Sequence, residues 1–279
     1  HPTYTSARVK KSELQSYIIR VEKEIFEIEE FVISAYRWEQ NKNEIPNKIT
    51  RLTQQEIKFS NPQTAADILA KSNEVFVQKS QLGGGSPMIR GFATNTVLLV
   101  VDGVRMNNAI FREGNLQNVI SLDANAIESS EVVFGPGSVT YGSDALGGVM
   151  DFHTLRPKLS TSDKLAFSGN AFARYSSANF EKTSHVDFNL GSSIWASLTS
   201  ISFSDFGDLR MGSQNHDEYQ RLDYVEQING IDSVLNNSDP NVQVPSGYNQ
   251  INLMQKLRFR PSKDLDIVYA IHYSKLSDV

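Results

Sequence analysis

Several common features are missing from this sequence. Its 279 residues include no cysteine, which excludes disulfide bridges, cysteine-ligated zinc and thiol nucleophiles. Its apolar runs, such as Val97–Val101, are far shorter than the roughly 20 residues that a membrane-spanning helix needs. The net charge of −5 and the isoelectric point of about 5.6 argue against nucleic acid as a partner.

Catalytic and metal-binding motifs are missing as well. None of the five histidines is spaced from another as two ligands on one helix would be, and no phosphate-binding loop or G-x-S-x-G nucleophile motif occurs. Carboxylates such as Asp102 and Glu131 lie where turns and strands account for them. We therefore expect no enzymatic activity, no resident metal and no bound cofactor.

Residues 86–154 combine short apolar strands with glycine-containing turns. Five consecutive apolar residues, Val97–Val101, predict a strand that is buried on both faces. Asp102 and Gly103 then predict a tight turn, and residues 104–106 a return strand. Residues 122–128 predict a short helix capped by Asp123, and residues 131–134 a further strand that ends at Gly135. The pattern predicts a small α+β unit.

Five short motifs recur in order within this region: IRG at 89–91, VDG at 101–103, EVV followed by GP at 131–136, YG at 141–142 and GG-V at 147–149. In this order they resemble the plug domain of TonB-dependent outer-membrane receptors. The alternative is a soluble α+β domain in which the glycines only shape turns. The resemblance implies that the plug turns are formed by Gly91, Asp102, Gly103, Gly135, Pro136, Gly142, Gly147 and Gly148.

The segment before the plug resembles the matching part of such receptors. Residues 1–28 are either the last strands of a small β-sandwich, like the carboxypeptidase-regulatory-like domain of many members, or a polar tail. Residues 29–57 are expected to hold a TonB box and a linker, with the plug at 58–156. Strand addition to a partner's sheet suits such a box, although an ordinary edge strand is the alternative. The box residues are Glu30, Phe31, Val32, Ile33, Ser34 and Ala35.

A helix is expected to start at the Asn61-Pro62 pair, because asparagine caps helices and proline suits the first turn. Ala65, Ile68 and Leu69 then fall on one face of this helix.

After Pro157 the pattern changes to long strands. In places apolar and polar residues alternate, as in Val186 and Phe188 against Asp187 and Asn189. Two connections are short, and the connection at 205–247 is long and polar. Strand length, alternation and uneven loops are typical of a transmembrane β-barrel. The five predicted strands are 165–175, 183–191, 195–203, 251–260 and 265–273.

Five strands cannot close around a plug, and the family has a 22-stranded barrel. We therefore expect a fragment in which an α+β plug is followed, at 157–279, by the first five antiparallel strands of such a barrel.

The resemblance implies active import across the outer membrane of a Gram-negative bacterium. Its expected partners are TonB, outer-membrane lipid and a transported iron complex or haem. Arg90 is assigned to ion pairing with barrel glutamates, and Glu131 to the same set of plug ion pairs. Many members carry an arginine just before the Gly-Pro pair, where this chain has Phe134. Where many members have Pro-Gly-Val after the first plug helix, residues 73–75 read Asn-Glu-Val.

The cargo is expected to meet the plug apex, which resembles that of the haem and iron-chelate branch. Haem or a ferric siderophore is the expected cargo, with vitamin B12 or a glycan as alternatives. A non-transporting surface binding or adhesion protein, or a signal transducer, is also compatible with the pattern. The expected apex residues are Arg105, Asn107, Asn108, Phe111 and Arg112.

Overall fold

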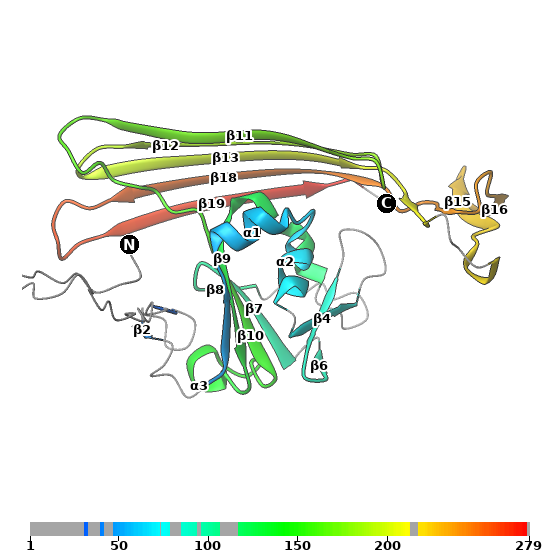
Figure 1. Ribbon diagram of the computed structural model, residues 1–279, viewed down its shortest axis with the longest axis horizontal. Helices are drawn as coiled ribbons and strands as arrows, with labels where there is room; N and C mark the ends of the chain where they lie inside the picture. Colours follow the sequence, from blue (N-terminus) through cyan, green and yellow to red (C-terminus); the bar gives the residue numbers. More distant parts are fainter. Residues whose placement is uncertain are drawn as a thin grey trace, which may run out of the picture.

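The computed structural model describes residues 31–32, 40–41, 47–72, 74–78, 85–93, 96–106, 117–212 and 217–277. Two parts lie against each other: an α+β unit within residues 49–154 and a sheet of long strands, the long sheet, formed by residues 166–276 (Figure 1). The proposed remnant domain at 1–28 lies outside the described residues. The fold class predicted from the sequence is confirmed.

A mixed five-stranded sheet forms the centre of the α+β unit. Its neighbours β10 and β7 run parallel, with Met150 opposite Leu99, and the other pairs are antiparallel. The strands lie in the order β3 (Ile49–Leu52), β9 (Ile127–Phe134), β10 (Gly148–Thr154), β7 (Val97–Val101) and β8 (Val104–Arg105).

Both faces of this sheet are covered, which explains the apolar run at β7. Val97 and Leu99 enter a core shared with α1 (Gln54–Ser60) and α2 (Ala65–Lys71). Leu98 and Val100 enter a second core on the opposite face. All five side chains of β7 are buried, as the sequence predicted. Each face of the sheet therefore has its own apolar core.

The helix expected to start at Asn61-Pro62 is α2, which begins later, after Thr64, and the helix before it, α1, was not predicted. Helix α1 begins after Thr53, which forms a capping box with Glu56, and it ends at Asn61, whose φ of 46° is left-handed. Asparagine tolerates this conformation at a helix end. Helix α2 begins after Thr64 and buries Ile68 and Leu69 as expected. Strand β3 and helix α1 also belong to the α+β unit, so the expected linker does not extend to residue 57.

Smaller elements complete the unit. Strands β4 (Val75–Gln78), β5 (Ser86–Ile89) and β6 (Phe92–Ala93) form a separate sheet. The predicted helix at 122–128 is shortened to η5 (Ala124–Ala126), because the chain enters β9 at Ile127. Asp123 does cap it, accepting a hydrogen bond from the Asn125 N–H at 3.0 Å. Two further short helices are η4 (Gln117–Ser121) and α3 (Ser138–Tyr141). No helix in the described ranges is long and apolar enough to cross a membrane.

The five long strands are consecutive antiparallel neighbours in one sheet. Their ends lie within three residues of the predicted ends, so these predictions are confirmed. The strands are β11 (Ala166–Ser176), β12 (Glu181–Gly191), β13 (Trp195–Phe206), β18 (Tyr248–Phe259) and β19 (Ile267–Leu276).

The two ends of the long sheet differ. At one end, the turn end, short turns join β12 to β13 and β18 to β19. At the other, the loop end, the long connection between β13 and β18 extends beyond the sheet (Figure 1). This connection contains β14 (Leu209–Arg210) paired with β17 (Val242–Gln243), a short helix η6 (Asp217–Tyr219), and a hairpin of β15 (Asp223–Ile228) and β16 (Ile231–Asn236).

Candidate functional site

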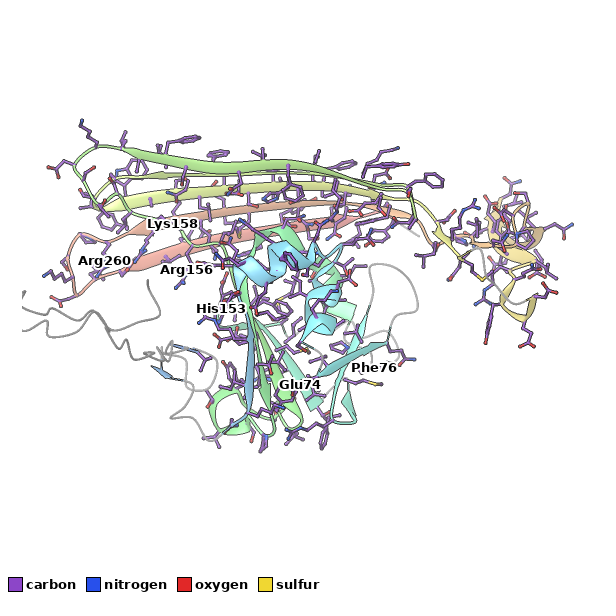
Figure 2. All side chains as sticks on the ribbon, viewed as in Figure 1. Glu74, Phe76, His153, Arg156, Lys158 and Arg260 are labelled. Atoms are coloured by element: carbon purple, nitrogen blue, oxygen red, sulfur yellow. The ribbon has the colours of Figure 1, made fainter. Side chains whose placement is uncertain are left out.

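The inner face of the long sheet is mostly polar, with one apolar contact where Leu198 and Met254 pack against Ala126. Along β12 every second side chain is buried against the α+β unit, and between them Val186 and Phe188 are more than a third exposed on the outer face. The buried set is Glu181, Thr183, His185, Asp187 and Asn189. Figure 2 shows His153, Arg156 and Lys158 following the connection from the unit to the sheet. We take this polar interface as the candidate site.

One ion pair joins the turn after β7 to β18. Lys256 Nζ lies 2.8 Å from Asp102 Oδ2, and the lysine side chain is 3% exposed. Thr154 donates to the same carboxylate through its N–H, at 2.9 Å, and its hydroxyl, at 2.6 Å. His272 Nε2 lies 3.7 Å from Asp102 Oδ2. Asp102 was predicted only as a turn residue; it also connects the unit to the sheet.

The charge of Asp102 follows from these contacts. Burial has the largest influence on its pKa and raises it. The charge of Lys256, with hydrogen bonds from Lys256 and Thr154, outweighs burial, so the pKa is lower than that of an ordinary aspartate. Asp102 is therefore ionised at neutral pH.

A second cluster connects the α1–α2 corner to β11 and β12. Glu181 is fully buried and accepts from Arg174 Nε at 2.7 Å and from the side-chain amide of Gln63. Arg174 also donates to the Asn61 side chain at 2.9 Å and to the Pro62 carbonyl at 3.0 Å. We call these five residues the Glu181 cluster. Its buried charges are paired and hydrogen-bonded, as charges inside a protein must be.

A third contact involves the cap of η5. Ser202 of β13 donates to Asp123 Oδ2 at 2.5 Å, and its hydroxyl also contacts His185 Nδ1 at 2.6 Å. His185 Nε2 lies 3.2 Å from Asp187. Burial raises the pKa of Asp123. Near the loop end, Gln250 donates to the Ile120 carbonyl at 2.9 Å.

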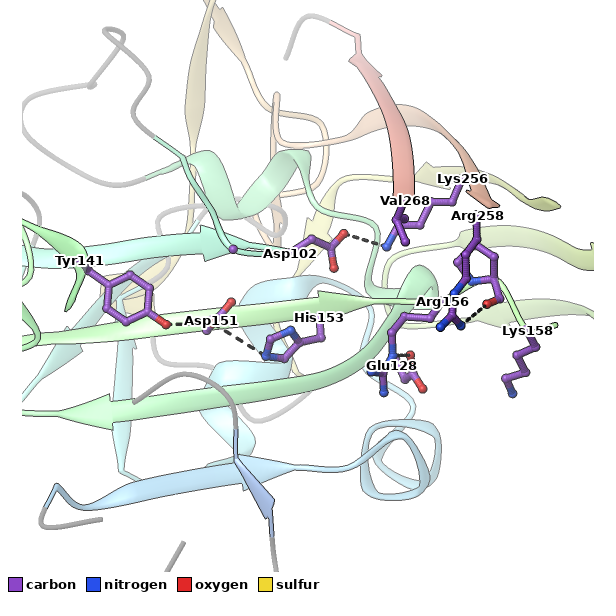
Figure 3. A pocket seen from close by; sticks show the side chains of 12 residues that line it. Asp102, Glu128, Tyr141, Asp151, His153, Arg156, Lys158, Lys256, Arg258 and Val268 are labelled. Carbon is purple, nitrogen blue, oxygen red and sulfur yellow. Dashed lines mark hydrogen bonds and ion pairs between the residues drawn. The ribbon is translucent and has the colours of Figure 1, made fainter. Parts of the chain in front are cut away.

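Large cavities lie along this interface between residues that the structure describes. The turn-end cavity, about 570 Å³, is lined by charged groups of the unit and by Lys256, Arg258 and Val268 of the sheet (Figure 3). The loop-end cavity, about 660 Å³, lies between η5, the β7–β8 turn and strands β18 and β19. The β12-side cavity, about 670 Å³, lies between α1, η5 and strands β11 and β12.

Glu131 of β9 and Asp151 of β10 are paired neighbours in the central sheet of the plug, on the face opposite α1 and α2. Glu131 is fully buried and its carboxylate lies 3.7 Å from Arg51 Nε, so this ion pair is internal to the unit. Asp151 accepts from the Tyr141 hydroxyl at 3.2 Å and lies 3.8 Å from His153. Burial raises the pKa of Asp151 to about 6, His153 opposes this, and the negative charge of Glu131 adds to it.

Arg90 lies in the turn between β5 and β6, is exposed, and has a φ of 50°. Its guanidinium carbon is 5.3 Å from the ring centroid of Phe134, a cation–π contact. Within the described residues it makes no ion pair with a carboxylate of the long sheet. Its pairing with barrel glutamates stays a prediction.

The predicted TonB box is partly described. Strand β1 (Phe31–Val32) pairs with β2 (Gln40–Asn41), and the Val32 side chain is buried in the second core with Leu98 and Val100. Glu30, Ile33, Ser34 and Ala35 lie outside the described residues.

Of the predicted apex, the structure describes only Arg105, which pairs with Asp144. Asn107, Asn108, Phe111 and Arg112 lie outside the described residues.

Most of the predicted turn residues lie in turns or loops, but Gly148 does not: it is the first residue of β10 and pairs with Val97 and Phe134. Asp102 and Gly103 both have positive φ, 49° and 80°, which suits a two-residue hairpin turn. Gly148 is required for a different reason: a Cβ there would lie 2.7 Å from the Val133 carbonyl oxygen. Positive φ also occurs at Gly91, at Gly135, which precedes Pro136, and at Gly142. Gly147 lies against the Phe92 side chain, where a Cβ would clash.

Sequence reasoning missed the interface partners. Lys256 and Glu181 gave one available signal, because each is a charged residue on the polar face of an alternating strand. The partners Gln63, Asp123 and Ser202 gave none, since ordinary caps and surface residues look the same. Among the described residues, no three His, Asp or Glu side chains come together as a metal site.

The fold and interface define a class of protein in which a plug-like unit is docked on the polar inner face of a sheet whose outer face is apolar. Residues 41–149 match the family model described as "TonB-dependent Receptor Plug Domain". The chain is 35% identical over 156 residues to a vitamin B12 transporter, BtuB, of Vibrio vulnificus strain CMCP6, covering 54% of this chain and 25% of the relative. It is 39% identical over 127 residues to the BtuB of strain YJ016, covering 44% and 20%.

Solved structures share the fold. The copper transporter OprC superimposes with a TM-score of 0.64 at 16% identity, covering 82% of this chain and 30% of that one. The alcaligin receptor FauA of Bordetella pertussis gives 0.60 at 15% identity, covering 88% and 35%. The α+β unit is therefore identified as the plug domain of a TonB-dependent receptor, and the long sheet has the fold of the strands that accompany the plug in these structures. The chain spans about a quarter of the length of the curated relatives it matches.

Proposed function

We propose that this receptor imports a scarce nutrient across the outer membrane of a Gram-negative bacterium, with energy supplied through TonB. The observation that carries the proposal is the plug docked on a polar inner face, with cavities left along the interface. An interface of a few ion pairs and hydrogen bonds separates at a smaller free-energy cost than an apolar core of the same size.

The outer face of the long sheet supports a membrane location. Large apolar side chains are more than a third exposed there, with Phe167 at 73% and Tyr269 at 60%. Contiguous apolar surface of this kind needs a cover, and lipid is the cover that suits alternating strands. The proposed partners are therefore outer-membrane lipid, TonB and the cargo.

Energy coupling through the TonB box has a structural requirement. Strand addition to TonB needs a free backbone edge, whereas β1 already pairs with β2 and Val32 is buried. Binding of TonB would thus withdraw Val32 from its core. A force that TonB exerts on the box would therefore act directly on the plug core through Val32.

The cargo is proposed at two levels. The apex sequence supports haem or a ferric siderophore as the cargo. We also propose that the apex residues contact the cargo and that Arg90 pairs with barrel glutamates. The names of the sequence relatives favour a second candidate, vitamin B12. A glycan, or a purely adhesive role, is tested by the same experiment.

Growth of a deletion strain complemented with the full-length gene tests the proposal. Separate cultures receive haem, a ferric siderophore, a glycan or vitamin B12 as the limiting nutrient. Ile33→Pro, which removes a backbone donor, should abolish rescue, and its matched control Ile33→Ala should retain it because backbone bonds carry strand addition.

Rescue on one nutrient by wild type and Ile33→Ala alone would establish both transport and cargo. Equal rescue by Ile33→Pro would contradict the box, and no rescue on any nutrient would contradict import.

A further inference from the structure

Two of the cavities lie in line along the same two strands. In the register of β18 and β19, Arg258 faces Val268 near the turn end, and Asn252 faces Ser274 near the loop end. The turn-end cavity extends from Arg258 to Lys256, and the loop-end cavity from Lys256 to Asn252. Together they run along the interface between the plug and these strands.

The boundary between these two cavities is small. Only Asp102, Lys256 and Val268 line both of them within the described part of the chain. Asp102 comes from the plug and Lys256 from the sheet, and their 2.8 Å ion pair crosses from one side to the other. Lys256 Nζ also contacts the Thr154 carbonyl at 3.5 Å, and His272 contacts Asp102 at 3.7 Å, so the ion pair is the shortest of three polar contacts between plug and sheet at this boundary.

The opposite side of the plug is held differently. The Glu181 cluster connects the α1–α2 corner to β11 and β12 through one buried carboxylate that accepts from both Arg174 and Gln63. Ser202 and Asp123 add a further bond nearby. The plug can therefore remain attached along β11–β13 while its contacts with β18 open. Besides the ion pair, these are the hydrogen bond from Gln250 to the Ile120 carbonyl and the packing of Met254 on Ala126.

The second core connects the predicted TonB box to this ion pair. Val32 packs with Leu98 and Val100 of β7, and Asp102 is the residue that follows β7. A pull that withdraws Val32 removes packing from the strand that carries Asp102. The box and the ion pair thus act on one rigid element.

We infer that the Asp102–Lys256 ion pair is a gate, and that cargo passes between the plug and strands β18–β19 while the plug stays attached to β11–β13. The inference rests on the proposed import function and adds the side of the plug on which the path lies. Withdrawal of Val32 by TonB loosens β7, Asp102 separates from Lys256, and the two cavities join.

Two alanines of η5 allow a matched test, because these 279 residues contain no cysteine. Any cysteine elsewhere in the full-length receptor is first replaced by serine. Ala126 is 3% exposed and lines the loop-end cavity, whereas Ala124 is 6% exposed and lines the β12-side cavity. Ala126→Cys and Ala124→Cys are made separately in the full-length receptor. Intact cells are treated with 2-aminoethyl methanethiosulfonate, and unreacted thiols are then counted by a gel shift with polyethylene glycol maleimide.

In energised cells we expect Ala126→Cys to react at least tenfold faster than after a protonophore, and Ala124→Cys to stay protected. Adding Asp102→Asn or Lys256→Gln should make Ala126→Cys reactive without energy. Glu128→Gln is the control, since Glu128 pairs with Arg156 at 3.1 Å and lines the turn-end cavity without reaching the loop-end one.

Equal reactivity at both alanines, or reactivity at Ala124→Cys alone, would overturn the inference, as would a protected Ala126→Cys in both gate variants. A failure of the import proposal gives a different result: the gate variants expose Ala126→Cys, but Ile33→Pro leaves its reactivity in energised cells unchanged.

Discussion

The central sheet of the plug and the long sheet bury different kinds of side chain. In the plug, the buried side chains of β7 are all apolar, and apolar cores cover both faces of its sheet. In β12 of the long sheet the buried side chains are polar or charged, and the apolar Val186 and Phe188 are more than a third exposed. Burial therefore does not specify apolar character by itself; the surroundings of each face decide which residues it carries.

This difference separates internal stability from docking. The hydrophobic effect holds the plug together, whereas mostly ion pairs and hydrogen bonds hold it against the strands, with one small apolar cluster of Ala126, Leu198 and Met254. Substitutions in the plug core should unfold the plug, and substitutions at the interface should release a folded plug.

The largest effect is expected from Phe152→Ala. Phe152 is fully buried in the plug core, and removing a buried phenylalanine ring costs about 3–5 kcal/mol of unfolding free energy. Pulse proteolysis of the purified receptor across a urea series measures the change. Phe167→Ala, on the outer face, is the control and should leave the plug midpoint unchanged; a shift of equal size there would remove the distinction between the sheets.

The next effect is expected from Glu181→Gln. It leaves the Arg174 side chain, 10% exposed, without its counter-charge, which should weaken docking by about 3 kcal/mol. Trypsin cleavage of the α1–α2 corner in native receptor reports this release. The adjacent Lys182→Gln breaks only an exposed contact, 3.8 Å from Asp205, and should change docking by less than about 0.5 kcal/mol; similar effects in both variants would contradict a buried anchor.

Asp151 gives the plug a pH dependence of its own. Its pKa is raised to about 6, so the folded plug binds this proton more tightly than the unfolded chain. Stability from this group is complete below about pH 4 and is lost as the pH rises through 6. Lowering the pH from 7 to 5 should add about 1–2 kcal/mol.

The wild-type receptor and Asp151→Asn are compared by urea titration at each pH. The difference between them isolates this carboxyl group from the others. A difference that does not change between pH 7 and pH 5 would rule out the assigned shift.

The smallest effect is expected from Thr53→Ala. It removes one half of the capping box of α1, in which the Thr53 N–H donates to Glu56 at 2.8 Å and the threonine hydroxyl accepts from the Glu56 N–H at 3.4 Å. The loss should be about 1 kcal/mol. Thr53→Ser keeps the cap and should behave as wild type in the same urea assay, so an equal loss in both variants would show that methyl packing is responsible.

Strands and turns could be predicted because their signals are local. Val97–Val101 and the Asp102-Gly103 turn follow from adjacent residues, as does the alternation along β12. The α1–α2 corner was mispredicted because Asn61 suits both a helix start and a left-handed helix end. The interface pairs, such as Asp102 with Lys256, join residues far apart in sequence, which no local pattern encodes.

The order of the plug strands also affects when the plug can fold. Strand β3 pairs with β9, and β7 pairs in parallel with β10, so Ile49 lies opposite Val133 and Leu99 opposite Met150. Contacts between residues so distant in sequence form slowly, because the intervening chain must be closed into a loop first. During synthesis the central sheet cannot be completed until Thr154 has emerged, which leaves a nascent chain a long interval without a stable plug.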